Sequence, residues 1–167
     1  IEDNDLKSFA IHCADNAEIE RRFLAARFPQ DIRDDLAALI PRTDYPLAVR
    51  SSSLLEDSQH QPFAGIYETY MVANREPTVD QRVDRVIQAI VRVYASMFTR
   101  QAKEYIAATH YRLEEEKMAV IVQRIVGTPH GTRFYPDISG VARSHNFYPT
   151  PPLEAADGIA AVALGLG

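Results

Sequence analysis

Hydrophobic residues recur at helical spacing in four parts of the chain. The strongest pattern runs from Thr78 to Phe98, where apolar side chains return every three or four residues. Thr78 is a suitable N-cap for this helix, and Asp80 lies in its first turn. Weaker patterns of the same kind predict helices over residues 16–26, 31–40 and 100–108.

Short runs of β-forming residues predict strands between these helices. Pro46–Val49 and Tyr67–Val72 read as strands, and the polar residues 51–62 between them read as a mobile loop. The apolar run Met118–Val126 predicts a buried strand. Further on, we expect a loop or hairpin tip over residues 127–136, a strand over 138–143, a linker over 149–152 and a strand over the apolar run 159–164. This mixture of helices and strands indicates an α+β or α/β fold.

Composition limits the class of protein. The chain has 167 residues, of which 46% are hydrophobic and 25% charged, enough for one domain with its own core. A net charge of -5 provides no general basic face, so we expect no nucleic-acid partner. We also expect no membrane partner, because no apolar run is long enough to span a bilayer.

Cysteine usage and the chain ends suggest a cellular context. Cys13 is the single cysteine, so an internal disulfide is impossible, and we expect a reducing, cytoplasmic location. No secretory leader is visible. Because the chain opens on Ile1 and stops just after an apolar run, we expect it to be a piece of a larger protein.

The stretch around Arg50 carries the clearest candidate chemistry. Arg50 and the serines Ser51–Ser53 follow an apolar run, and the small-residue turn Phe63–Gly65 leads to the next run, which contains Thr69. A guanidinium is a planar fork of donors for phosphate oxygens, and hydroxyls add uncharged donors. Glycine lets backbone amides approach a ligand closely. The pattern therefore predicts a polyphosphate site, although a surface ion pair between Arg50 and Glu56 or Asp57 is an alternative.

Gln123 is the second candidate. It interrupts the run Met118–Val126, where a buried amide would need hydrogen-bond partners. One interpretation is an outward-facing residue on an edge strand. The other is that Gln123 and backbone groups near Ile125 and Val126 contact a flat polar ring such as adenine.

The histidines give no metal signal. The five of them are scattered without the spacing of metal ligands, and we expect ordinary surface or loop roles for them: His12, His60, His110, His130 and His145. The sequence also lacks a Walker-type lysine loop and a G-x-G-x-x-G motif, which disfavours the two commonest nucleotide-binding folds.

Several ordered motifs resemble one known family. Val49–Ser52 with Glu56–Asp57, then Phe63–Thr69, Ile87–Phe98 and Met118–Val126 resemble the N-terminal nucleotide-binding domain of phosphoenolpyruvate synthase and pyruvate phosphate dikinase. Ser139–Ala142 and Ala163–Gly167 continue the same order. The resemblance covers roughly residues 46–167, whereas the first forty or so residues match no motif of this family.

The resemblance implies a fold and a domain organisation. The family's domain has an ATP-grasp fold, so we expect a partial α+β ATP-grasp fold with a mixed or antiparallel sheet and flanking helices. Residues 1–45 would form a helical N-terminal segment and residues 46–167 part of the nucleotide-binding domain, together one compact but incomplete domain.

The resemblance also implies roles for individual residues. Arg50 matches the family's phosphate-binding arginine and is the expected catalytic residue. The expected ATP-binding residues are Arg50, Ser51, Ser52, Gly65, Thr69, Gln123, Ile125 and Val126. Arg143 stands where many members have an apolar residue, and we expect a possible phosphate contact there. No metal ligand is expected within this chain.

The implied function is that of a phosphotransferase module. In this family ATP phosphorylates a histidine on a separate domain, which passes the phosphoryl group to pyruvate or a related acceptor. The expected cofactors are ATP and Mg²⁺, with the Mg²⁺ ligands beyond Gly167, and the expected partners are the phosphohistidine and acceptor-binding domains of the same polypeptide. The family's preceding glycine-rich segment with a lysine is missing from the chain.

Two expectations follow from these departures from the family pattern. The isolated chain should bind ATP weakly or not at all and should not turn over. The alternative function is a non-catalytic ATP-grasp-like binding or interaction domain within a larger multidomain protein.

Overall fold

A computed structural model describes residues 6–53, 55–56, 65–109, 111–113 and 116–165. Its helices and antiparallel sheets confirm the α+β class. Contacts divide the chain into two compact units, Ile1–Arg124 and Ile125–Gly167. The predicted division between residues 45 and 46 falls inside the first unit.

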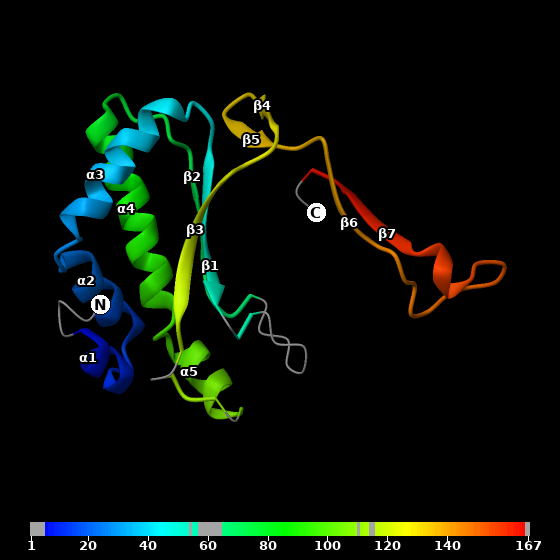
Figure 1. Cartoon of the computed structure of the whole chain (residues 1–167), viewed down its shortest axis with the longest axis horizontal. Helices are drawn as coiled ribbons and strands as arrows, with labels where there is room; N and C mark the ends of the chain where they lie inside the picture. The colour runs from blue at the N-terminus through cyan, green and yellow to red at the C-terminus, as the bar shows by residue number, and fades with distance from the viewer. Residues whose placement is uncertain (1–5, 54, 57–64, 110, 114–115, 166–167) are drawn as a thin grey trace. The chain divides into compact units, whose positions relative to one another are not determined.

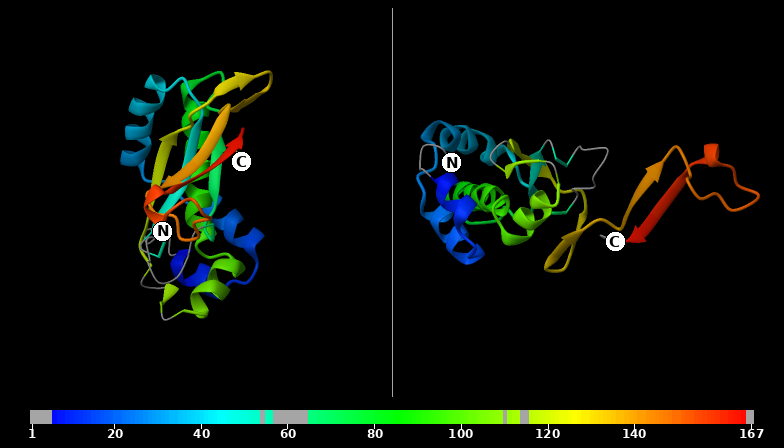
Figure 2. Two further views of the ribbon diagram at one scale, coloured as in Figure 1. Left: turned by 90° about the vertical axis from the view of Figure 1, so that its right-hand side faces the viewer. Right: turned by 90° about the horizontal axis from the view of Figure 1, so that it is seen from below.

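A three-stranded antiparallel sheet forms one layer of the first unit. Strands β1 (Leu47–Ser53), β2 (Thr69–Val72) and β3 (Met118–Arg124) lie in the order β2-β1-β3. Helix α4 (Val79–Ser96) contacts all three strands. Helices α2 (Asn16–Ala25) and α3 (Gln30–Leu39) pack on α4, so the helices cover one face of the sheet (Figures 1 and 2).

The helices begin close to where the sequence predicts them. The Thr78 side chain caps α4, and its hydroxyl accepts a hydrogen bond from the Gln81 backbone N–H at 3.3 Å. Helix α5 (Arg100–Ala107) confirms the fourth predicted helix. A 3-10 turn, Ile40–Arg42, follows α3 and contains Pro41. The short helix α1 (Leu6–His12) was not predicted, because its seven residues are too few for a clear periodic pattern.

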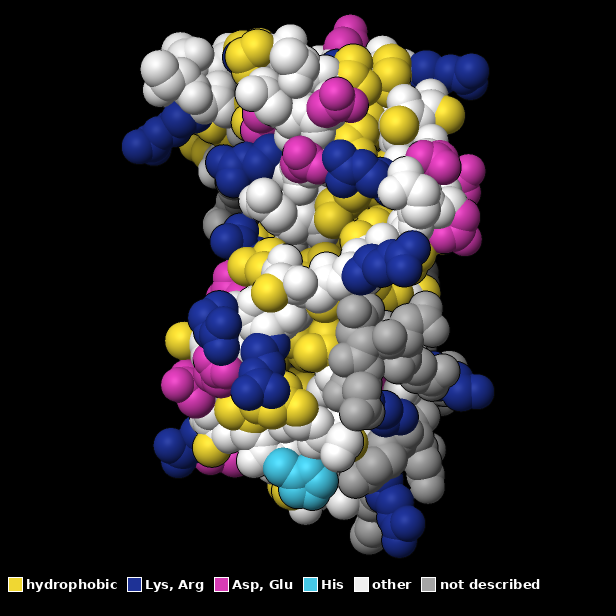
Figure 3. Space-filling view, turned by 90° about the vertical axis from the view of Figure 1, so that its left-hand side faces the viewer, with side chains coloured by type: hydrophobic (Ala, Val, Ile, Leu, Met, Phe, Trp, Pro, Cys, Tyr) yellow, Lys and Arg dark blue, Asp and Glu magenta, His cyan; other side chains and the backbone are white. Residues whose placement is uncertain are grey.

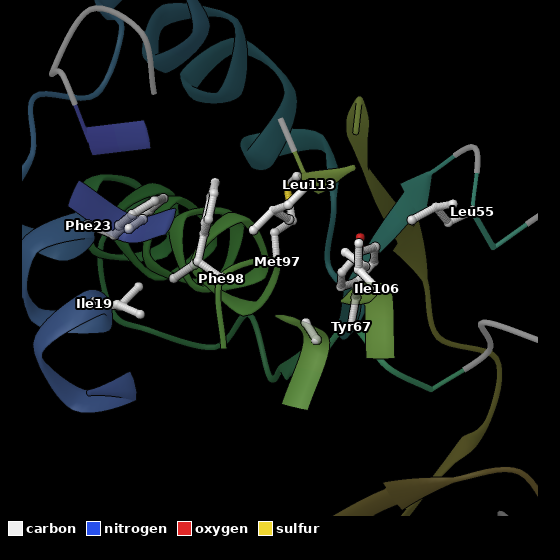
Figure 4. Close-up of a cluster of buried hydrophobic side chains, with 11 residues drawn as sticks. Ile19, Phe23, Leu55, Tyr67, Met97, Phe98, Ile106 and Leu113 are labelled. Carbon is white, nitrogen blue, oxygen red and sulfur yellow. The ribbon is translucent and has the colours of Figure 1, made fainter. Parts of the chain in front are cut away.

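Two hydrophobic clusters meet along α4. One contains Ile19 and Phe23 from α2 together with Phe98, whose ring centroid lies 5.7 Å from that of Phe23 (Figure 4). The other joins Val49 of β1 to the inner side of α4, with Val83 fully buried. The periodic apolar stripe of α4 therefore serves both clusters.

The structure corrects the prediction for two of the strands. Residues 51–53 belong to β1 and not to the predicted loop, because they pair with β3 and because Ser51 and Ser53 find hydrogen-bond partners at this end of the strand. Most of the remaining predicted loop, 57–62, lies outside the described residues. The prediction of a buried β3 was wrong, because β3 lies at the edge of the sheet and every second side chain is exposed.

A buried polar network fixes the segment that leads into β1. Asn74 has a φ of 58° and donates from Nδ2 to Thr43 O at 3.1 Å, Thr43 Oγ1 at 3.0 Å and Tyr45 O at 3.0 Å. Arg82 on α4 donates to Asn74 Oδ1 at 2.8 Å and also to the carbonyls of Ile40 and Thr43. The start of β1 is thereby tied to α4.

The outer surface of the helical layer carries charges of both signs. Acidic, basic and hydrophobic side chains are interspersed on this face (Figure 3). Arg33 pairs with Asp84 at 2.7 Å and Arg92 with Glu20 at 2.8 Å, and both pairs join α4 to a neighbouring helix. Among the described residues, no helix is both long enough and apolar enough to cross a membrane.

The second unit consists of two antiparallel hairpins. Strands β4 (Thr128–His130) and β5 (Arg133–Tyr135) confirm the predicted hairpin tip. Strands β6 (Ile138–Arg143) and β7 (Ile159–Leu164) confirm the two predicted strands. Gly140 pairs with Val162, and a Cβ at this glycine would lie 2.5 Å from the Ala161 carbonyl oxygen, so no larger residue fits there.

Candidate functional site

Arg50 lies on the exposed side of the central strand. Its neighbours Val49 and Ser51 are buried on the side that faces α4, and side chains alternate along a strand, so Arg50 points to the other face. We call this face the open face. It is formed by Ala48, Arg50 and Ser52 of β1, Thr69 and Met71 of β2, and Ala119, Ile121 and Gln123 of β3.

The strand register brings three of the predicted site residues together. Arg50 lies directly opposite Thr69 of β2. Directly opposite side chains in an antiparallel pair have Cβ atoms about 4.5–5.5 Å apart. Gln123 lies opposite Ala48, two residues along β1 from Arg50, which is a shift of about 7 Å. The guanidinium, a hydroxyl and a carboxamide therefore share one face.

The Arg50 guanidinium is free to receive an anion. Within the described residues, it takes part in no hydrogen bond or ion pair. The alternative of an ion pair with Glu56 is wrong, because both oxygens of the Glu56 carboxylate accept hydrogen bonds from Ser51 and Ser53 on the opposite side of β1. Asp57, the other proposed partner, lies outside the described residues.

The two neighbouring serines are not equivalent. Ser52 is half-buried on the open face and pairs with Ala119 of β3. Ser51 is buried on the helix side, where its hydroxyl donates to Glu56 Oε1 at 2.9 Å. The structure thus brings Ser52 to the side of Arg50 and puts the Ser51 hydroxyl on the other side.

The remaining predicted ligands lie elsewhere in the chain. Gly65 is exposed with a φ of 83°, a conformation that favours glycine, and it precedes β2 by four residues. Ile125, Val126 and Arg143 belong to the second unit, where Val126 is 77% exposed and Arg143 pairs with Ile159. Their predicted contacts with ATP stay predictions.

Sequence reasoning missed the apolar part of the open face. Met71 is 65% exposed and Ile121 is 42% exposed, although both side chains are large and hydrophobic. Met71 and Gln123 lie on either side of Ala48 and form one row across the three strands. Ile121 lies opposite Arg50 in the next row. The two-residue alternation within β2 and β3 was the signal that could have found them. The open face therefore combines polar donors with an apolar surface that a nucleobase could cover.

The open face does not offer a metal site. No group of three or more histidine, cysteine, aspartate or glutamate side chains that could hold a metal exists in the described part of the chain. The open face holds guanidinium, hydroxyl and amide groups, whereas Mg²⁺ prefers carboxylate oxygens. The residues present on this face therefore do not fit Mg²⁺.

The described histidines make local contacts. The Nε2 atom of His130 lies 3.0 Å from Thr128 Oγ1 and 3.5 Å from Asp137 Oδ1, and its ring stacks on Tyr135 at 4.0 Å. These contacts join residues of one hairpin and its flank. His60 and His110 lie outside the described residues.

The chain is similar to several curated phosphotransferases. It is 29% identical over 126 residues to "Rifampicin phosphotransferase" of Bacillus subtilis, covering 74% of this chain and 13% of the relative. It is 34% identical over 123 residues to "Phosphoenolpyruvate synthase" of Pseudomonas aeruginosa, covering 70% of this chain and 14% of the relative. A "Probable phosphoenolpyruvate synthase" of Archaeoglobus fulgidus is 34% identical over 82 residues, which cover 49% of this chain and 10% of the relative. The matched region thus spans 10–14% of the length of these three relatives.

A family model covers nearly the whole chain. The model described as "Pyruvate phosphate dikinase, AMP/ATP-binding domain" matches residues 2–167. The match includes all three strands of the open face as well as the first forty residues, for which the sequence motifs gave no assignment. The chain therefore belongs to the family of the AMP/ATP-binding domain of pyruvate phosphate dikinase.

Proposed function

We propose that this chain is the nucleotide-binding part of an ATP-dependent phosphotransferase of the dikinase type, and that Arg50 binds the phosphates of ATP. The observation that carries the proposal is the Arg50 guanidinium, which has no partner among the described residues and lies directly opposite Thr69 on the open face of the sheet. Family membership supports the use of ATP. The ATP-grasp fold is part of the same proposal.

The chemistry of phosphoryl transfer explains what these groups would contribute to ATP binding. Such transfer asks mainly for positioning and for neutralisation of charge. The Arg50 fork would offset charge on the β- and γ-phosphates, while the Thr69 and Ser52 hydroxyls would orient their oxygens. One charge-assisted contact of this kind contributes about 1.5–3 kcal/mol.

The open face also suggests a direction for the nucleotide along the strands. Gln123 and Met71 occupy the row next to Arg50 and offer an amide and an apolar surface. We infer that the adenine lies toward this row and the phosphates toward Arg50 and Ser52. Ile125 and Val126 follow β3 directly, so their backbone groups would border the base.

Catalysis would require parts of a longer polypeptide. Because the open face lacks carboxylates, we propose that the Mg²⁺ ligands lie outside this chain. The histidine that receives the phosphoryl group and the site for pyruvate or a related acceptor would belong to other domains of the same polypeptide, in the cytoplasm. The isolated chain would then bind ATP weakly or not at all and show no turnover.

The test is phosphorylation of histidine from ATP in the full-length polypeptide. Arg50→Ala should abolish formation of the acid-labile phosphohistidine. Arg21→Ala removes an arginine on the exposed surface of α2 and should leave it unchanged. Unchanged phosphohistidine formation in Arg50→Ala would overturn the assignment of Arg50. A wild-type polypeptide that binds ATP without forming phosphohistidine would favour the alternative of a non-catalytic binding domain.

A further inference from the structure

We propose that Glu56 is a positioning residue that holds β1 from the side opposite Arg50 and so fixes the direction of the guanidinium. This inference rests on the proposed function of Arg50. It assigns a role to a glutamate that the sequence motifs include but that the phosphate site does not use. The argument starts from the point where β1 loses one of its two partner strands.

The two partner strands accompany β1 over different lengths. Pairing with β3 continues to Ser53, opposite Met118. Pairing with β2 ends at Arg50, opposite Thr69. In the described part of the chain, residues 51–53 therefore have no partner strand on the β2 side. Arg50 stands at the last position of β1 that is held on both sides.

Glu56 provides hydrogen-bond acceptors beyond this point. Its Oε2 atom accepts from the Ser53 backbone N–H at 3.0 Å, and its Oε1 atom accepts from the Ser51 hydroxyl at 2.9 Å. The Glu56 backbone N–H donates in turn to Ser53 Oγ at 3.3 Å. One side chain thus holds the backbone and a side chain of the strand immediately after Arg50.

The surroundings of this contact are buried. Ser51, Ser53 and Leu55 are each less than 5% exposed. The Glu116 carboxylate lies beside the same serine and turn, and its Oε1 atom is buried, so this end of β1 is shielded from water on that side as well. Buried donors without acceptors are costly, which means that removing Glu56 leaves this end of β1 with unsatisfied groups.

Alternation along the strand links this cluster to the phosphate site. Ser51 and Ser53 lie on the helix side, whereas Arg50 and Ser52 lie on the open face, so fixing one set fixes the other. A small displacement of a positioned group can reduce ligand affinity or rate strongly. Loss of Glu56 should therefore weaken phosphate binding although Glu56 itself lies on the other side of the strand.

Three substitutions of Glu56 distinguish the effect of its side-chain length from the effect of its charge. Glu56→Ala removes both acceptors. Glu56→Asp keeps the charge but is one methylene too short to serve both serines. Glu56→Gln lacks the charge, yet its carbonyl oxygen can accept from the Ser53 N–H while its amide donates to the Ser51 hydroxyl. A positioning role predicts that Ala and Asp weaken ATP binding and that Gln restores it.

The experiment measures binding of ATP and of adenosine to the full-length polypeptide by calorimetry. Glu56→Ala and Glu56→Asp should lower the affinity for ATP roughly tenfold or more, with the affinity for adenosine unchanged and Glu56→Gln close to the wild type. In an Arg50→Ala background, Glu56→Asp should cause a much smaller loss of ATP affinity, because its main effect passes through Arg50 and only the part that passes through Ser52 remains.

Three results would overturn the inference. The first is that Asp keeps the affinity for ATP while Gln loses it, which would indicate a role for charge. The second is that Glu56→Ala or Glu56→Asp lowers the affinities for ATP and adenosine equally. The third is that Glu56→Asp lowers the affinity for ATP as much in the Arg50→Ala background as in the wild type. If Glu56→Ala fails to fold, the Asp and Gln variants decide alone. If Arg50→Ala by itself leaves ATP affinity unchanged, the proposed function fails and this inference fails with it.

Discussion

Arg50 and Thr69 lie directly opposite each other at the position where the pairing of β1 with β2 ends. Both side chains are exposed on the face of the sheet that is turned away from α4. A cationic fork and a hydroxyl are thus held side by side by backbone pairing alone. Their common direction requires no contact between the two side chains.

Arg50→Lys should weaken ATP binding even though the positive charge remains. Lysine is a point charge without the planar fork that contacts two phosphate oxygens at once. We expect a measurable loss of binding free energy that is smaller than the ~1.5–3 kcal/mol of a complete charge-assisted contact. Calorimetric titration of the full-length polypeptide with ATP measures the loss. Equal affinity in wild type and Arg50→Lys would argue against bidentate binding.

Thr69→Val should lower the affinity for ATP without changing stability. Valine keeps the β-branched shape that suits an exposed strand position and removes only the hydroxyl. A hydrogen bond to a charged phosphate oxygen contributes about 1.5–3 kcal/mol, which is roughly a tenfold to hundredfold change in Kd. Thr69→Ser keeps the hydroxyl and is the matched control. A loss of equal size in Thr69→Ser would point to side-chain packing as the cause.

The fold was largely predictable where the pattern is local. The stripe of α4 and the N-cap Thr78 identify a helix from sequence alone, and the structure confirms both. The extent of β1 was not predictable in this way. Serines 51–53 favour loops, and only their pairing with β3, together with the acceptors on Glu56, makes them part of a strand.

The sequence predicted the residue types of the site but not the face of the sheet on which each side chain lies. Adjacent residues of a strand point to opposite sides, but the sequence predicts a loop from Ser51 onward, so it could not tell that Ser51 and Ser52 lie on opposite sides of β1. The same limit applies to Gln123. Its exposure follows from its place on the open face, opposite the face that α4 covers, which only the topology and the register reveal.

Asn74→Ala should destabilise the first unit strongly. The change removes three hydrogen bonds from Nδ2 and the acceptor for Arg82 Nε, all close to the buried Thr43. Leaving buried polar groups unsatisfied costs about 1–3 kcal/mol each, so we expect a loss of at least ~2 kcal/mol. Urea denaturation monitored by circular dichroism gives the free energy of unfolding.

Asn74→Gly separates the lost hydrogen bonds from backbone strain. Asn74 has a φ of 58°, which glycine adopts freely and alanine does not. Asn74→Gly should therefore be more stable than Asn74→Ala by up to ~1 kcal/mol while still less stable than the wild type. Wild-type stability in both variants would show that the network contributes nothing.

Phe98→Ala should cost about 3–5 kcal/mol, because it leaves a cavity in a close-packed cluster. The Phe98 side chain is 1% exposed and packs against Phe23. Phe147→Ala is the control, since that ring is 67% exposed and its loss should change stability by less than ~0.5 kcal/mol. Thermal unfolding monitored by calorimetry compares the two. A small effect of Phe98→Ala would mean that the cluster is loosely packed.

Glu116 should make stability depend on pH above the ordinary pKa of a carboxyl group. Burial raises the pKa of Glu116 above 4.5, and the charge of Glu56 raises it further, against hydrogen bonds from Ser53 and Leu55. The folded state therefore holds this proton more tightly than the unfolded state. The stabilisation is fully present below pH 4.5 and is lost as pH rises through the raised pKa.

Glu116→Gln removes this dependence, because the amide cannot ionise while its oxygen still accepts a hydrogen bond. The stability of the wild type relative to Glu116→Gln should fall as pH rises from 4.5 toward neutrality. Urea denaturation at a series of pH values measures the difference. Glu104→Gln makes the same change at an exposed carboxylate on α5, outside the buried cluster, and is the control for replacing a carboxylate by an amide. If the stability curve of Glu116→Gln runs parallel to that of the wild type, the Glu116 carboxyl has an ordinary pKa in the folded protein. The polar cluster at the end of β1 would then be more open to water than its burial indicates.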